Sequence, residues 1–271
     1  MEESGNARLS EDEQDEVQGH VPMRAPVVYE VVRRQGEEEL VRPIVSLWWS
    51  GIAAGIGMFA SLTAKGLLHG ALPDTPWRPL VANFGYSIGF LIVMLGRLQL
   101  FTENTITAVL PLLAHWSRSN IACVARLWSV VFAANLLGTL LTAAVTLAVL
   151  SPPAHLAAFV EVSHEFAALS AAECLWRGIP AGFFVALIVW MLPSARGSEF
   201  LVIVVLTWLI GVGGYAHVIV GSAEAFLLLL AGEIGLLKAV GGLILPSLVG
   251  NVIGGTVLFA LLAYAQVREE M

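Results

Sequence analysis

Residues 200–230 read FLVIVVLTWLIGVGGYAHVIVGSAEAFLLLL, and this stretch decides the fold class. About twenty mostly apolar residues already cross a bilayer as a helix, so the stretch is longer than one simple span. Its middle, 211–217, is rich in glycine and ends on His217. Irregular backbone at membrane depth is tolerated only where it is buried in protein or lines a wet cavity. The stretch therefore predicts a membrane span that is interrupted at an inward-facing point.

A second stretch has the same character. Residues 81–113 are also too long for one crossing, and they are interrupted by GRLQLFTEN at 96–104. Six apolar segments in all meet the length test, approximately Leu47 to Leu68, Val81 to Leu113, Ile121 to Leu150, Phe166 to Leu192, Phe200 to Leu230 and Val240 to Val267. The interruptions occupy the middle of each set of three, as in an inverted repeat whose half-helices meet near the midplane. We therefore expect an all-α membrane protein with six transmembrane helices, of which the second and fifth are broken.

Composition agrees with a membrane protein, because 57% of the residues are hydrophobic and only 13% are charged. Acidic residues outnumber basic ones by 21 to 14, but seven of the acids fall among the first sixteen residues. We interpret residues 1–42 as an acidic cytoplasmic tail, disordered to about Ala25, with a short amphipathic helix on the membrane surface over Val27 to Val41. Residues 43–271 are expected to form the transmembrane domain, in contact with lipid and not with nucleic acid.

Basic residues near the span ends predict the orientation. One side would carry Arg33, Arg34, Arg42, Arg118, Arg126, Arg196 and Arg268, whereas the opposite loops offer mainly Lys65, Arg78 and Lys238. By the positive-inside rule both termini are cytoplasmic, in a multi-pass protein of the plasma (inner) membrane.

His217 is the only histidine that falls inside a predicted span. An imidazole at membrane depth is costly without a partner or water, and it can exchange a proton near neutral pH. The alternative is a histidine that simply packs between helices. Glu224 lies two helical turns further along the same face, and Gly221 between them leaves space. Glu224 is either a proton or cation partner of His217 or a residue of the membrane surface.

The other interruption offers oxygen groups just where the next half-helix should begin. Thr102 would be a serviceable N-cap, with Glu103 and Asn104 close behind it, and capping is the simplest explanation of this cluster. A functional alternative is that the positive end of the half-helix faces a permeating solute. The two interpretations are compatible.

Signatures of enzymes and bound groups are missing from the sequence. No zinc-protease helix, nucleophile elbow or phosphate-binding loop occurs, so we expect no enzyme and no cofactor. Cys123 and Cys174 stand alone and predict neither a disulfide nor a metal site. Spacings such as Gly51-x-x-x-Gly55 and Gly250-x-x-x-Gly254 indicate close helix packing.

Three motifs, in order, resemble those of the formate/nitrite transporter family. They are Leu100-Phe101-Thr102-Glu103-Asn104-Thr105, the glycine-rich approach to His217, and Gly250-Asn251-Val252-Ile253-Gly254-Gly255. The likeness runs from about Pro43 to Val267. It implies an aquaporin-like protomer in a homopentamer with one pore in each subunit. It also implies that His217 and Thr102 flank a central chamber through which small monovalent anions pass with proton exchange.

The sequence departs from that family pattern at the expected lysine near the start of the fourth span. Its place, counted with Glu173 aligned to a family glutamate, falls at Phe166, next to Glu165. At the two positions where the family pattern has asparagine, this sequence has Gly182 and Gly221. These departures resemble the branch of the family labelled YfdC-like. A carboxylate in place of a cation reverses a field worth about 4 kcal/mol at 4 Å with an effective dielectric constant near 20. Glu165 either faces the pore or lies in a water-exposed loop.

The primary hypothesis is a membrane channel or transporter for a small monovalent ion or a neutral small solute, with a preference for cations over formate. His217 would be the proton-exchanging gate, Thr102 its hydroxyl partner, and Glu103, Glu165 and Glu224 determinants of selectivity. One alternative is a weak-acid anion transporter with proton coupling. Another is a non-transporting membrane scaffold that binds a partner through the acidic tail.

Overall fold

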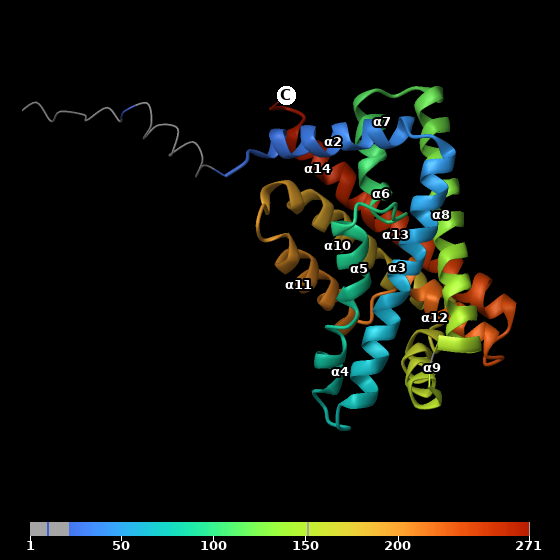
Figure 1. The fold of residues 1–271 in the computed structure, drawn as a ribbon. Helices are drawn as coiled ribbons and strands as arrows, with labels where there is room; N and C mark the ends of the chain where they lie inside the picture. The colour runs from blue at the N-terminus through green and yellow to red at the C-terminus, as the bar shows by residue number, and fades with distance from the viewer. Residues whose placement is uncertain (1–9, 11–21, 151, 271) are drawn as a thin grey trace, which may run out of the picture.

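The structure, a computed structural model, describes residues 10, 22–150 and 152–270, and these form an all-helical bundle (Figure 1). Within this part of the chain, five helices are long and apolar enough to cross a membrane: Ile44–Ala71, Arg78–Leu95, Arg118–Val149, Ala171–Ser194 and Leu237–Val267. The acidic residues of the first sixteen lie outside the described residues. The all-α membrane fold predicted from the sequence is confirmed.

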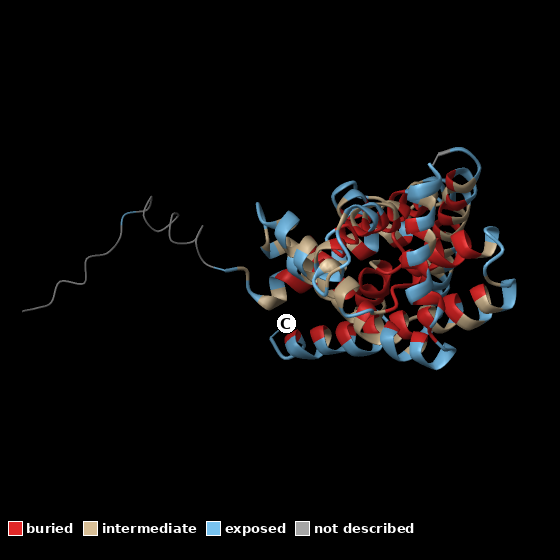
Figure 2. Ribbon diagram, turned by 90° about the horizontal axis from the view of Figure 1, so that it is seen from below, coloured by how far each residue is buried: buried red, intermediate tan, exposed pale blue. Residues whose placement is uncertain are grey.

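The elements follow one another in this order: α2 (Ala25–Val41), α3 (Ile44–Ala71), α4 (Arg78–Ala82), α5 (Ser87–Leu95), α6 (Asn104–Thr107), α7 (Val109–Ala114), α8 (Arg118–Val145), η1 (Thr146–Leu150), α9 (Pro153–Ala167), α10 (Ala171–Met191), η2 (Leu192–Ser194), α11 (Glu199–Val212), α12 (Val218–Leu230), η3 (Leu237–Ile244), α13 (Leu245–Val252), η4 (Ile253–Ala260) and α14 (Leu261–Val267). Buried residues concentrate between the helices, and exposed residues line their outer faces (Figure 2). Many of the exposed residues are large and apolar, as lipid contact requires.

Helical structure is interrupted within each of the two long apolar stretches, 81–113 and 200–230. It ends with α5 at Leu95 and resumes with α6, and it ends with α11 at Val212 and resumes with α12. Each gap contains a residue in the left-handed region, Arg97 with φ 53° and Gly214 with φ 59°, which a continuing helix does not admit. Three apolar helices beside these gaps, Asn104–Ala114, Glu199–Val212 and Val218–Leu230, are each too short to cross a membrane alone. Six complete spans therefore stay a prediction.

The two ends of the bundle are distinct in Figure 1. α2, in the region where the sequence predicts a short helix, lies at the same end as α14. Tyr29 and Tyr264 face each other with ring centroids 6.0 Å apart, and Arg24 lies 3.6 Å from Glu270. We call this end the terminal side. α4 and α9 lie at the opposite end, which we call the α9 side.

The predicted start of the fourth span at Phe166 is wrong. Phe166 belongs to α9, which ends at Ala167, and α10 begins separately at Ala171. A capping box separates them. The Ser170 amide donates to Glu173 Oε2 at 2.8 Å, and the Ser170 hydroxyl accepts from the Glu173 amide at 3.2 Å. This reciprocal pairing satisfies the first amides of α10 and sets its start.

Buried asparagines hold the two gaps. From α8, Asn135 donates through Nδ2 to the carbonyls of Gly51 and Gln99, both at 2.8 Å, and accepts from the Phe101 amide at 2.9 Å. From α13, Asn251 donates to the carbonyls of Gly178 and Ala216 at 3.0 and 2.8 Å. It accepts from the Val218 amide at 2.9 Å. Each amide side chain therefore ties one gap to one neighbouring helix.

In each half, a glycine lets one helix approach the helix that carries the buried asparagine, α3 with α8 and α10 with α13. At Gly55 in α3, a Cβ would collide with the carbonyl oxygen of Asn135. At Gly182 in α10, it would collide with the carbonyl oxygen of Asn251. Only glycine permits these two approaches, and without them the asparagines would not reach the gaps. The repeated arrangement supports the predicted inverted repeat.

Replacing Asn135 with Leu should destabilise the protein by roughly 3 kcal/mol or more, because the buried Phe101 amide and two carbonyls lose their partner. Unfolding in mixed micelles measures this loss. Thr142→Val is the matched control on the same helix, since its hydroxyl bonds only a carbonyl of its own helix. Equal stability of the two variants would contradict the role given to Asn135.

Candidate functional site

His217 stands at the start of the half-helix α12 and is 1% exposed. Its Nδ1 accepts a hydrogen bond from the Val220 amide at 3.3 Å, and its Nε2 lies 2.8 Å from Thr102 Oγ1. Because Nδ1 accepts, the neutral ring carries its hydrogen on Nε2 and donates it to Thr102. Phe90 and the imidazole pack in a T-shaped arrangement, with ring centroids 4.8 Å apart. The imidazole thus caps α12 and joins the two gaps.

Thr102 does not have the capping role expected of it. α6 has no side-chain cap, and its N-cap position is occupied by Glu103. The Thr102 hydroxyl meets His217 instead, while its carbonyl accepts from Thr105 Oγ1 at 2.7 Å. The N-cap prediction is therefore wrong, because a partner from the other half of the chain takes the hydroxyl.

A cavity of about 240 Å³ opens on the α9 side of this pair. It brings together all four predicted site residues of the second half. Its lining includes Lys65, Asn83, Tyr86, Glu165, Phe166, Arg177, His217, Gly221 and Glu224. The charged groups are two cations and two carboxylates. His217 forms the inner part of this lining, together with residues of the gap before α12.

The ring of Phe166 occupies the space over Gly221. A Cβ at Gly221 would lie 2.6 Å from the end of that ring. The glycine between His217 and Glu224 therefore does not leave open space as the sequence indicates. It admits an aromatic ring from α9 that narrows the cavity between the two polar residues.

Glu165 lines the α9-side cavity and has a partner that the sequence does not reveal. Its Oε2 accepts from Lys65 Nζ at 2.7 Å. Lys65 was expected in an outer loop, but it lies within α3 and is only 7% exposed, whereas 59% of the Glu165 side chain is exposed. Because α3 continues to Ala71, Lys65 lies inside the helix and not in a loop. The position that lacks the family lysine is thus accompanied by a lysine from another helix.

Glu224 is buried, with 6% exposure, and lines the same cavity. Within the described part of the chain its carboxylate has no hydrogen bond and no ion pair, although the charges of Lys65 and Glu165 act on it. A buried carboxylate without a partner is costly unless water or a ligand reaches it. Glu224 is therefore available to a solute in the cavity.

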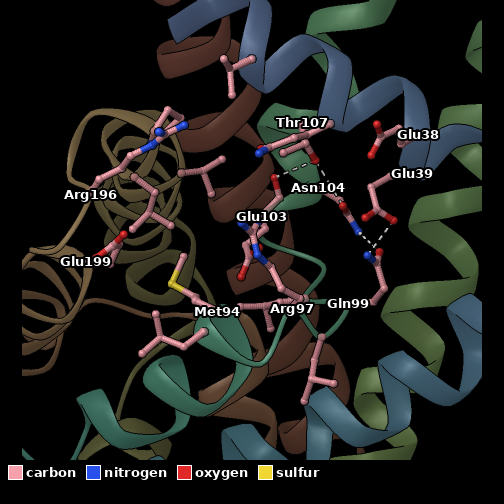
Figure 3. A pocket seen from close by; sticks show the side chains of 18 of the residues that line it. Glu38, Glu39, Met94, Arg97, Gln99, Glu103, Asn104, Thr107, Arg196 and Glu199 are labelled. Atoms are coloured by element: carbon pink, nitrogen blue, oxygen red, sulfur yellow. Dashed lines mark hydrogen bonds between the residues drawn. The ribbon is translucent and has the colours of Figure 1, made fainter. Parts of the chain in front are cut away.

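A larger cavity, of about 730 Å³, opens on the terminal side (Figure 3). Glu103 and Asn104 line it, so the structure separates these two predicted residues from His217 and Glu224. The charged residues of its lining are Glu38, Glu39, Arg97, Glu103, Arg196 and Glu199. Four carboxylates face two guanidinium groups, and this cavity is formally negative.

Hydrogen bonds connect the first gap to α2 across the terminal-side cavity. Gln99 Nε2 donates to Glu39 Oε2 at 2.7 Å, and Asn104 Nδ2 donates to Gln99 Oε1 at 3.3 Å (Figure 3). Asn104 Oδ1 in turn accepts from Thr107 Oγ1 at 3.2 Å. Both polar atoms of the Asn104 side chain therefore already have protein partners, and the residue supports the gap.

Glu103 is the exception in this network. Its Oε1 is buried without a hydrogen-bond partner among the described residues, and Arg97 is the nearby cation that acts on it. Glu103 directly follows Thr102, which has no exposure at all. The Thr102–His217 pair thus stands between two cavities. Among the described residues, Glu224 is a buried carboxylate without a hydrogen bond in one lining, and Glu103, with one buried oxygen, is a half-buried one in the other.

Sequence reasoning missed Lys65, Arg177, Gln99 and Asn135. Asn135 carried a readable signal, because an amide within an apolar span is expensive and must find partners. Gln99 lay inside the noted interruption. Lys65 and Arg177 stand near span ends, where basic side chains usually reach the membrane surface, so only three-dimensional contacts distinguish them. The described residues contain no group of three or more His, Cys, Asp or Glu side chains suited to a metal ion.

Comparisons with known proteins identify the family to which the sequence motifs point. The model of the family described as formate/nitrite transporter matches residues 26–265. The inner membrane protein YfdC of Escherichia coli (strain K12) is 40% identical over 252 residues, which cover 93% of this chain and 81% of that protein.

Among solved structures, one named "FNT family ion channel" superposes with a TM-score of 0.77 at 19% identity, over 88% of this chain and 98% of that one. Another, a pentameric formate channel with formate bound, gives 0.70 at 18% identity, over 83% and 98% of the two chains. At these identities the likeness shows the fold alone.

Thr102→Val should destabilise the protein by about 1–3 kcal/mol, because the buried Nε2–H of His217 loses its acceptor. Thr102→Ser retains the hydroxyl and should lose much less. Thermal unfolding in detergent compares the two variants. If valine and serine proved equally tolerated, the Thr102–His217 bond would not be the contact that joins the gaps.

Proposed function

This chain belongs to the formate/nitrite transporter family, and from that premise we propose that it forms a pore for a small monovalent cation or a neutral small solute. The observation that carries the proposal is the pair of carboxylates, Glu103 and Glu224, which have no hydrogen bond and line the cavities on either side of Thr102 and His217. Carboxylates that lack a hydrogen bond at membrane depth favour a cation or a hydrogen-bond donor over an anion.

Charge in the two cavities supports the same preference. The terminal-side cavity has two more carboxylates than cations in its lining, and the α9-side cavity is balanced. Glu165 contributes less negative field than an unpaired carboxylate would, because Lys65 neutralises it at 2.7 Å. The selectivity for cations therefore rests on Glu103 and Glu224 more than on Glu165.

His217 is proposed as the proton-exchanging gate. In the neutral ring Nδ1 accepts the Val220 amide, whereas a protonated ring has two donors and cannot accept it. Protonation would therefore break the cap of α12 and turn or release the ring. Thr102 is the hydroxyl partner that holds the neutral form.

A weak-acid anion transporter is the second candidate function. Lys65 and Arg177 in the lining of the α9-side cavity favour it, because both would attract an anion toward His217. Proton donation at His217 would then let the substrate cross as a neutral acid. The two candidates require opposite selectivity and share the same path.

The assembly and location follow the relatives. We propose a homopentamer with one pore in each subunit, since one solved relative is a pentameric channel and both cavities lie within a single protomer. The inner membrane is the proposed location, after the Escherichia coli relative. The positive-inside distribution of basic residues supports the proposal that both termini are cytoplasmic.

Purified protein in liposomes should pass potassium or ammonium faster than formate or nitrite. Stopped-flow light scattering and ion-selective electrodes measure these fluxes at matched gradients, with empty liposomes as the control. Movement of formate without movement of either cation would discard the cation proposal and favour the anion transporter.

Replacing Glu224 with Gln should lower cation flux by about tenfold, because a charged lining raises the local counter-ion concentration by at least that factor. Glu103→Gln should act in the same direction from the other cavity. Glu233→Gln is the matched control, since Glu233 is exposed and lies outside both linings. If cation flux were unchanged in both lining variants, Glu103 and Glu224 would not set the selectivity, and the cation proposal would be rejected.

A further inference from the structure

The Lys65–Glu165 ion pair joins two helices at the mouth of the α9-side cavity. Lys65 belongs to α3 and Glu165 to α9, a hundred residues later, and both belong to the cavity lining. The Lys65 side chain is largely buried, with 9% of it exposed, and Glu165 is the carboxylate that accepts its hydrogen bond. A buried ammonium group needs such a partner, so the position of Lys65 depends on Glu165.

Glu224 lies within the electrostatic reach of this ion pair. Lys65 attracts the Glu224 carboxylate and Glu165 repels it. Arg177 is the other cation of the lining, and its guanidinium is 3.9 Å from Glu173, at the start of α10. With Lys65 and Glu165 paired, the formal charges of the lining cancel.

We propose that Lys65 is a specificity-determining residue, whose charge is offset by Glu165 and sets the electrostatic balance of the α9-side cavity. This inference rests on the proposed pore and deepens it. The ion favoured at this mouth follows from the sum of the two charges. Removing Lys65 leaves Glu165 and Glu224 facing Arg177 alone, and the cavity becomes negative. Removing Glu165 leaves the Lys65 cation without its carboxylate, and the cavity becomes positive.

A neighbouring pair separates this electrostatic role from simple clamping of α9 onto α3. His69 Nε2 lies 3.0 Å from Glu161 Oε1, four residues along each helix from Lys65 and Glu165. The hydrogen bond from His69 holds the pKa of Glu161 below its usual range, so this carboxylate is also charged at neutral pH. Neither residue belongs to the cavity lining. His69 and Glu161 therefore provide a matched control that joins the same helices.

The test compares the full-length protein with Lys65→Met, Glu165→Gln and the double variant in liposomes. The measured quantity is the ratio of rubidium to formate permeability. We expect Lys65→Met to raise the ratio about tenfold and Glu165→Gln to lower it about tenfold. The double variant restores the balance and should return to within about threefold of the original ratio. Lys65→Arg keeps the charge and should keep the ratio.

Ion-induced thermal stabilisation by rubidium chloride and by sodium formate provides a readout that does not require flux. When the variants are ranked by how much more rubidium chloride stabilises them than sodium formate does, the ranking should match that of the permeability ratios. The inference is overturned if Lys65→Met leaves both readouts unchanged, or if His69→Gln or Glu161→Gln shifts them as much as Lys65→Met does. Absence of flux in every variant would reject the proposed pore, and the stabilisation series would still decide the role of Lys65.

Discussion

Peptide groups at the two gaps cannot stay unpaired inside a membrane, and the rest of the structure depends on how they are paired. Asn135 and Asn251 each bond one gap and one neighbouring helix with three hydrogen bonds. Buried hydrogen bonds therefore hold both gaps in place. Because both gaps are held, Thr102 and His217 can meet at 2.8 Å from opposite halves of the chain.

The large features of this fold could be predicted because membrane physics makes them visible in the sequence. Apolar length reveals the spans, and glycine or polar residues within that length reveal the gaps, since both are costly in hydrocarbon. His217 was found by the same reasoning. Asn135 carried the same signal, but its carbonyl partners lie 36 and 84 residues away, so its task was not readable locally.

The errors have a common physical origin. Thr102 satisfies the local rule for an N-cap, yet His217, 115 residues away, takes its hydroxyl. Lys65 satisfies the local rule for a basic residue near a span end, yet α9 brings Glu165 to it. In both cases a short-range preference worth about 1 kcal/mol yields to a contact between buried polar groups, which are more expensive to leave unpaired. Local rules therefore identify polar residues better than they identify their partners.

The two halves of the chain share their framework, whereas the two cavities, each lined by residues of both halves, differ in charge. The asparagines and the glycines that admit them recur in both halves, whereas the carboxylates exceed the cations only on the terminal side. Fixed charges of this kind set how strongly an ion is held in each cavity and how fast it enters. They cannot set its final distribution across the membrane, because a passive pore lowers barriers in both directions equally. Accumulation of a solute would require coupling to another gradient, and His217 is the group in the proposed path whose protonation could provide it.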